Sequence, residues 1–188
     1  MHSSEETDRE VACSLEEMTR LIETLGGVVV DTLVQKRQKP DPAMYIGKGK
    51  AAEVARLVVQ HGASLVAFDG ELSGGQQRNL EKAANCRVID RTGVILDIFH
   101  NHARTKEAKN QVELASLEYL ATHLTRRWTH LERQKGGIGM RGAGEKQIEL
   151  DRRMIDKSIK STRERLVKVK KQRQTQRRQR ERRDAFNI

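Results

Sequence analysis

Apolar and polar positions in the first hundred residues follow two alternating patterns. Helical spacing begins after Ser14, which is expected to cap the helix in a capping box with Glu17, and ends at the Gly26-Gly27 pair. Short apolar runs then alternate with further helical stretches. Strands are predicted at 28–34, 64–68 and 87–89, and helices at 51–59, 73–85 and 92–98. This alternation predicts an α/β fold: a small parallel sheet in a three-layer domain over residues 14–104, after a flexible segment 1–13.

Beyond residue 104 the apolar positions recur every three or four residues, which is the heptad spacing of packed long helices. One seam consists of Leu114, Leu117, Ala121, Leu124, Trp128 and Leu131, and a second of Ile148, Ile155, Ile159 and Leu166. Two seams joined by a loop predict a long, coiled-coil-like antiparallel α-helical hairpin over 105–183, with a tip loop at 133–144. Residues 170–183 form a basic tail without an apolar face, and residues 184–188 are expected to begin a linker.

The expected tip is unusually rich in glycine. Five of the nine residues from Gly136 to Gly144 are glycine, and Arg141 carries the segment's only charge. Because glycine has no Cβ, such a backbone can approach a ligand closely. Glu145 then opens a helix that runs into the basic tail. This arrangement predicts a probe that reaches into structured nucleic acid.

Charge is divided unevenly along the chain, whose formal net charge is +10. Residues 1–132 carry 17 Lys and Arg against 19 Asp and Glu, whereas residues 133–183 carry 19 against 6. The second part therefore predicts a polyanionic partner, most simply RNA. Aromatic residues make up only 3%, so we expect contacts to phosphates and shape rather than base stacking. The candidate contacts are Gly136, Gly137, Gly139, Arg141, Gly142, Gly144, Arg152, Arg153, Lys170, Lys171, Arg177 and Arg178.

A cytoplasmic location is expected. The N-terminus is acidic, unlike a signal peptide, and no apolar run approaches the roughly 18 residues of a membrane-spanning helix. The basic tail lacks the apolar face of a membrane-surface helix, so no membrane insertion is expected.

A second candidate phosphate site lies at the start of the helix predicted from residue 51. Gly47, Lys48, Gly49 and Lys50 combine free helix N–H groups with two cations. The alternative to a weak nucleotide site here is a tight turn with solvated lysines.

Other patterns carry no function in our interpretation. The segment 72–78 reads LSGGQQR, the signature of ABC-type ATPases, but the chain has no G-x-x-x-x-G-K-[ST] segment, so we interpret it as a helix N-terminus. His100 and His102 lack enough neighbouring ligands for a metal site. Cys13 and Cys86 lie far apart, and no catalytic constellation is evident.

Several ordered blocks resemble one known family. Residues 136–153 read GGIGMRGAGEKQIELDRR, which is similar to the GGxGxRGPGExQxExDRR signature of the HflX family of ribosome-associated GTPases. Ala143 stands where proline is usual, and Lys146 where threonine is common. Further blocks that look like this family are Ile46–Lys50, Gln76–Glu81, Val88–Thr92, Ile95–Phe99, Ala103–Thr105 and Gln111–Ala115.

The resemblance implies the N-terminal region of such a GTPase. The P-loop G domain of the family would begin where this chain stops, at Ile188. GTP and Mg²⁺ would belong to that absent domain, and no cofactor is expected in this chain. The resemblance implies binding to rRNA of the large ribosomal subunit and, in the full protein, a GTP hydrolase that splits stalled ribosomes under stress. We expect a monomer. The glycine-rich loop would be inserted near the peptidyl-transferase centre.

Two other functions remain open at this point. Some family members are reported to use ATP through their N-terminal region, which makes the Gly47–Lys50 segment a candidate ATP-binding or ATPase site. A third hypothesis is a coiled-coil interaction module with a protein partner.

Overall fold

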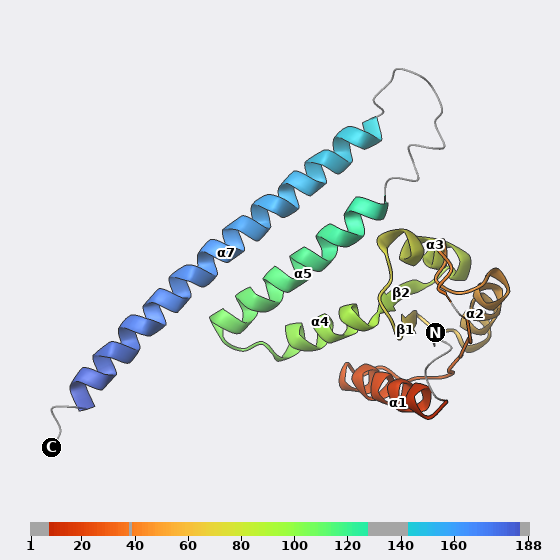
Figure 1. The fold of residues 1–188 in the computed structure, drawn as a ribbon, viewed down its shortest axis with the longest axis horizontal. Helices are drawn as coiled ribbons and strands as arrows, with labels where there is room; N and C mark the ends of the chain where they lie inside the picture. The colour runs from red at the N-terminus through yellow and green to blue at the C-terminus, as the bar shows by residue number, and fades with distance from the viewer. Residues whose placement is uncertain (1–7, 38, 128–142, 185–188) are drawn as a thin grey trace.

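A computed structural model describes residues 8–37, 39–127 and 143–184 of the 188-residue chain. Helices dominate, and two short strands lie between them (Figure 1). In chain order the elements are α1 (Asp8–Thr24), α2 (Lys48–His61), β1 (Leu65–Phe68), α3 (Gly74–Ala84), β2 (Arg87–Asp90), α4 (Arg91–His102), α5 (Lys106–Arg127) and α7 (Ala143–Asp184). In the part of the chain so described, no helix is both long and apolar enough to cross a membrane.

A parallel sheet of β1 and β2 forms the middle of the α/β body, with Leu65 paired to Arg87 and Phe68 to Asp90. Successive strand side chains point to opposite faces of the sheet. Val66 therefore packs with the core cluster that α2 and α3 contribute, whereas its neighbour Leu65 packs with the cluster from α1 and α4. The predicted three-layer arrangement of helix, parallel sheet and helix is confirmed.

Local capping signals place the helix ends. Ser73 caps α3 in a capping box with Gln76, and Asn85 ends the helix in the left-handed conformation. Gly62 ends α2 in the same conformation, with a φ of 62°. The bounds of α3 agree closely with the predicted 73–85, whereas α2 begins three residues before and ends two residues after the predicted 51–59. The apolar stretch from Thr92 is helical, as predicted, and lies within α4.

The first helix begins earlier than predicted. α1 starts at Asp8, so Ser14 lies inside the helix rather than at its N-cap. The Ser14 hydroxyl donates a hydrogen bond to Asp69, and Glu17 forms an ion pair with Arg91. Ser14 and Glu17 thus form no capping box. Their polar side chains form tertiary contacts instead, which hold α1 against the body.

The strand predicted at 28–34 is wrong. In the described residues no strand spans this segment, and Val28 keeps 83% of its surface exposed. The sheet therefore has two described strands rather than three. Asp31 explains part of this result, because its side chain accepts the N–H of Thr32 at 2.7 Å. A side chain that bonds the local backbone competes with a strand ladder.

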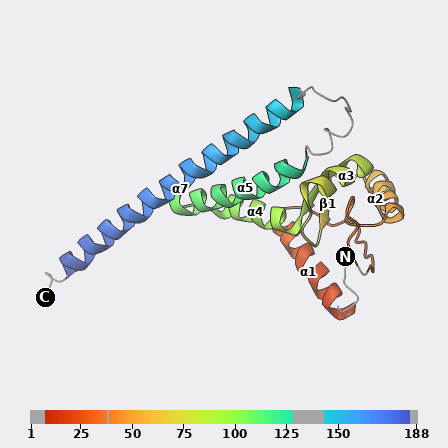
Figure 2. The same cartoon turned by 45° about the horizontal axis from the view of Figure 1, so that its top comes forward.

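Helices α5 and α7 lie side by side and antiparallel in both views (Figures 1 and 2). Glu107 at the start of α5 pairs with Arg173, whereas Glu118 further along pairs with Arg163. Residue numbers thus rise along one helix as they fall along the other. The predicted antiparallel hairpin is confirmed, although α7 begins at Ala143, inside the predicted tip loop.

The seam between the two helices contains a residue that the apolar pattern omitted. Ile155, Ile159 and Leu166 are half-buried, as expected for seam positions. Thr162 lies between them in the same spacing and is completely buried. The α7 side of the seam is therefore more polar than the apolar pattern predicts.

Candidate nucleic-acid interface

The outer surface of α7 presents most of the predicted basic contacts. Its 42 residues are largely straight-chain helix formers such as Lys, Arg, Glu and Gln, which favour a long helix. Six of the candidates lie on this helix with exposed side chains: Arg152, Arg153, Lys170, Lys171, Arg177 and Arg178. The basic tail is helical through residue 183, so its charges are held at fixed positions along the helix.

Two of these six arginines and lysines are already paired within the helix. Arg153 binds Glu149 at 2.6 Å, and Arg177 binds Glu181 at 3.3 Å, both four residues apart. Such exposed pairs contribute only about 0.3–0.5 kcal/mol each. Over the described residues, no ion pair involves the remaining candidates of the tail, Lys170, Lys171 and Arg178.

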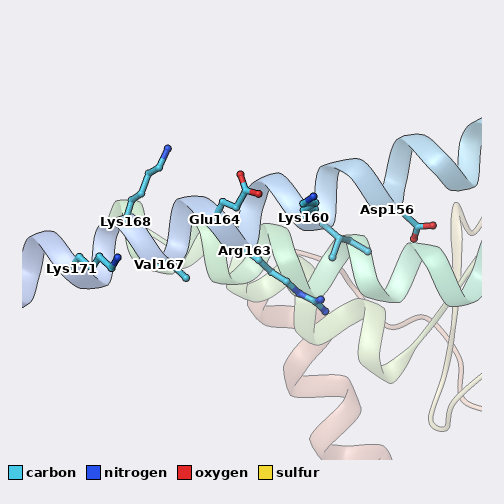
Figure 3. Close-up of a pocket in the computed structure, with 8 residues that line it drawn as sticks. Asp156, Lys160, Arg163, Glu164, Val167, Lys168 and Lys171 are labelled. Carbon is cyan, nitrogen blue, oxygen red and sulfur yellow. The ribbon is translucent and has the colours of Figure 1, made fainter.

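An open groove follows α7 on the side next to this basic surface (Figure 3). Lys168 and Glu164 point away from the helix in this view, whereas Arg163 points toward α5. The residues lining the groove are Asp156, Ile159, Lys160, Arg163, Glu164, Val167, Lys168 and Lys171. Four cations against two carboxylates make this an anion-attracting surface.

Acidic partners from α5 were missed by the sequence analysis. Glu118 binds Arg163 at 2.7 Å, and Glu113 binds Arg165 at 2.7 Å. The charge count of residues 133–183 includes only the acids within that segment, so it leaves out the acids of α5. The acidic positions of α5 are visible in the sequence, but pairing them requires the register of the hairpin.

A smaller hollow lies where the two helices of the hairpin meet. Arg152 of α7 lines it together with Ile155 and Asp156, opposite Ala121 and Leu124 of α5. Arg152 therefore stands at the junction of both helices, near the start of α7.

A buried carboxylate attaches the hairpin to the α/β body. Asp90, at the end of β2, is only 1% exposed. Its Oδ1 accepts the N–H of Gly93 at 2.8 Å and the hydroxyl of Tyr119 at 2.9 Å, while Oδ2 accepts the N–H of Leu72 at 3.2 Å. Burial, and then the negative charge of Asp90, raise the pKa of Tyr119 above its ordinary value. Strand β2, helix α4, the loop before α3 and helix α5 are thus joined at one side chain.

His123 completes this joint one helical turn beyond Tyr119. The two rings lie 4.0 Å apart, and Nδ1 of His123 lies 2.9 Å from the Tyr119 carbonyl oxygen. α3 approaches α5 very closely here, because a Cβ added to Gly74 would lie 2.1 Å from the carbonyl oxygen of His123. The close packing of α3 on α5 therefore explains why residue 74 of the LSGGQQR segment is glycine. This agrees with our interpretation of that segment as a helix N-terminus.

The Gly47–Lys50 segment lies at the N-terminus of α2, as predicted. Gly47 is the N-cap, and its N–H donates to the side chain of Gln35 at 2.9 Å. Lys50 forms an ion pair with Glu53 at 2.9 Å, whereas Lys48 is exposed. The nucleotide site at this turn stays a prediction.

Most of the predicted glycine-rich probe lies outside the described residues. This applies to Gly136, Gly137, Gly139, Arg141 and Gly142. Gly144 falls within α7. The structure describes helices α5 and α7, between which this segment lies in the sequence.

Two family models match nearly the whole chain. Residues 12–100 match the model described as GTP-binding GTPase N-terminal, and residues 102–180 match GTP-binding GTPase Middle Region. The α/β body and the hairpin are thus the N-terminal and middle regions of a GTP-binding GTPase.

Curated relatives narrow this class. The chain is 52% identical to the GTPase HflX of Escherichia coli (strain K12) over 160 residues, which cover 85% of this chain and 38% of that protein. It is 47% identical to the GTPase HflX of Flavobacterium psychrophilum, covering 87% of this chain and 40% of the relative. The chain belongs to the HflX family, and it spans about two fifths of the length of these relatives.

Solved structures share the fold. A crystal structure of SsGBP in complex with GDP matches with a TM-score of 0.64 and 21% identity, covering 85% of this chain and 42% of the other. A GTP-binding protein from Sulfolobus solfataricus in complex with GDP matches with a TM-score of 0.51 and 22% identity, covering 79% and 42%.

The residues of this chain do not fit a GTP site of the P-loop type. Its sequence contains no G-x-x-x-x-G-K-[ST] segment. The Lys50 ammonium is held by Glu53 on its own helix, and the Gly47 N–H is held by Gln35. The family implies GTP and Mg²⁺ for the full protein, and no step of GTP chemistry is assigned to the residues of this chain.

Proposed function

We propose that this chain is the rRNA-binding part of an HflX-type GTPase and that it binds the large ribosomal subunit. The observation that carries the proposal is the basic surface of α7, where Lys170, Lys171 and Arg178 are exposed on a single helix. At about 1.5 Å per residue, the 42 residues of α7 extend over roughly 60 Å. This length is suited to following an RNA backbone across several phosphates.

The rest of the molecule positions this surface. The Asp90 joint attaches α5 to the body, so the hairpin projects in a fixed direction. In the proposed complex Arg152 and Arg153 anchor the backbone of the rRNA near the tip. Residues 136–144 then enter an RNA pocket near the peptidyl-transferase centre, where Arg141 contacts a phosphate or a base. In the full protein this insertion separates the ribosomal subunits.

The test is co-sedimentation of the chain with purified large ribosomal subunits at increasing salt. A variant lacking residues 136–144 serves as the comparison. We expect the wild-type chain to pellet with the subunits, and the deletion variant to pellet less at every salt concentration. If both pellet equally and salt releases both alike, the glycine-rich segment is no specific probe and only the basic helix binds. If neither pellets, the proposal is wrong for this chain.

A further inference from the structure

Polar contacts contribute to the packing of the two hairpin helices. Among the described residues of α5 and α7, the two that are buried are His123 and Thr162, and both are polar. His123 packs toward the body, so Thr162 is the buried residue between the two helices. The seam residues Ile155 and Leu166 stay half-exposed. Contacts other than a dry apolar core must therefore contribute to holding α7 on α5.

Three glutamates of α5 supply these contacts. Glu107 binds Arg173 at 2.6 Å, Glu113 binds Arg165 at 2.7 Å, and Glu118 binds Arg163 at 2.7 Å. A further hydrogen bond joins the Thr162 hydroxyl to Glu113. The three pairs extend from Glu107 to Glu118 on α5 and from Arg163 to Arg173 on α7, and all three fit one antiparallel register.

The paired arginines nevertheless remain accessible. Side-chain exposures are 62% for Arg163, 47% for Arg165 and 60% for Arg173. A guanidinium group binds carboxylate and phosphate oxygens with the same fork of N–H donors. The pairs of Arg163 and Arg165 are exposed on both sides and are therefore weak, whereas Glu107 in the Arg173 pair is only 18% exposed. At Arg163 and Arg165 a phosphate can therefore replace the carboxylate at little cost.

We propose that the carboxylates of Glu107, Glu113 and Glu118 bind three arginines of α7 in place of phosphate groups, until RNA phosphates displace them. This inference rests on the proposed function, because it assigns part of the RNA-binding surface and its regulation. In the free protein the arginines are masked from non-specific polyanions. The exposed lysines of the groove, Lys168 and Lys171, make the first contact with the RNA backbone. The arginines then exchange their partners.

The exchange defines an extended site. Arg163 and Arg173 are separated by about 15 Å along the helix, at about 1.5 Å per residue. Arg163 already lines the groove that Lys168 and Lys171 share, so the two sets of cations form one surface (Figure 3). Asp156 and Glu164, which also line the groove, are the carboxylates that would oppose the phosphates there.

The test compares two triple variants of the full chain that alter net charge equally. The first is E107Q/E113Q/E118Q. The control is E16Q/E23Q/E71Q, which removes three exposed glutamates of the body. Binding to a labelled short RNA duplex is measured by fluorescence anisotropy over a range of KCl concentrations, and circular dichroism verifies that helix content is unchanged.

We expect the first variant to bind the duplex about tenfold more tightly than wild type at low salt, since three carboxylates no longer compete for the arginines. The gain should shrink at high salt, where the pairs are screened. The control should gain less than about twofold. Adding R163Q/R165Q/R173Q to the first variant should remove the gain, which shows that the gain acts through these arginines.

Equal affinities of the first variant and the control would overturn the inference while leaving the proposed function intact, provided that the wild-type chain binds. A gain that survives the three arginine substitutions would overturn it as well. If wild type and both triple variants fail to bind RNA, the proposed function and the inference fail together.

Discussion

Tyr119→Phe tests the joint between hairpin and body with the removal of one oxygen atom. The Tyr119 hydroxyl donates to the buried Asp90 carboxylate at 2.9 Å, while the N–H groups of Gly93 and Leu72 keep their bonds to the same carboxylate. A hydrogen bond to a charged group contributes about 1.5–3 kcal/mol. We therefore expect the unfolding free energy of the variant to fall by about 2 kcal/mol.

Urea denaturation followed by circular dichroism measures this decrease. In a thermal scan it corresponds to roughly 4–8 °C, at about 2–4 °C per kcal/mol for a chain of this size. A double-mutant cycle with Asp90→Asn isolates the pairwise contribution. A Tyr119→Phe variant within about 0.5 kcal/mol of wild type, with no coupling to Asp90→Asn, would refute the reasoning that this bond fixes α5 on the body.

The same residue gives a pH dependence of known sign. Burial and the Asp90 charge raise the pKa of Tyr119 in the folded chain above its value in the unfolded chain, which is about 10. The folded state thus keeps the proton longer than the unfolded state does. The corresponding stability is present below pH of about 10 and is lost as the pH rises through the folded-state pKa. The stability advantage of wild type over Tyr119→Phe should therefore narrow above pH of about 10, and an advantage that grows in that range would contradict the assignment.

Three further variants test other features. Gly74→Ala should destabilise the chain by about 1–3 kcal/mol in urea denaturation, because the new Cβ meets the His123 carbonyl oxygen at 2.1 Å; Gly49→Ala, with no atom within 4 Å, is the control and should be neutral or stabilising. Replacing Lys170, Lys171 and Arg178 by Ala should weaken RNA binding and reduce the slope of its salt dependence by up to about one unit for each phosphate that is no longer neutralised, whereas Arg20→Ala on α1 should not. Lys48→Ala should weaken ATP binding in a titration if the Gly47–Lys50 turn is a nucleotide site, and a wild-type chain that shows no ATP binding would exclude that alternative.

Features set by neighbours in the sequence were predictable. The α3 cap needs only Ser73 and Gln76, three residues apart, and the end of α2 needs only Gly62. The parallel pairing of β1 and β2 followed from two short apolar runs separated by a helix. In each case the physical determinant lies close by in the chain.

The failed predictions share a different cause. Ser14 and Glu17 have the spacing of a capping box, yet they bind Asp69 and Arg91, which are distant in sequence. The segment 28–34 has the composition of a strand, but a strand also requires a partner for its backbone, and composition does not supply one. A local sequence pattern indicates which contacts a residue is able to form. The tertiary fold determines which of these contacts it forms.

At the candidate interface, too, the sequence predicts the local charge but not the tertiary ion pairs. The sequence locates the excess of basic residues in the second part of the chain and so predicts a polyanion partner. It cannot separate the cations that are available to that partner from those already paired, because Glu113 and Arg165 lie 52 positions apart and meet only through the hairpin register. Arg165 and Lys171 carry equal weight in a charge count. In the structure Arg165 is paired with a carboxylate, whereas Lys171 lines an open groove. If RNA binds as proposed, the salt dependence of binding should reflect these two classes of cation rather than one net charge.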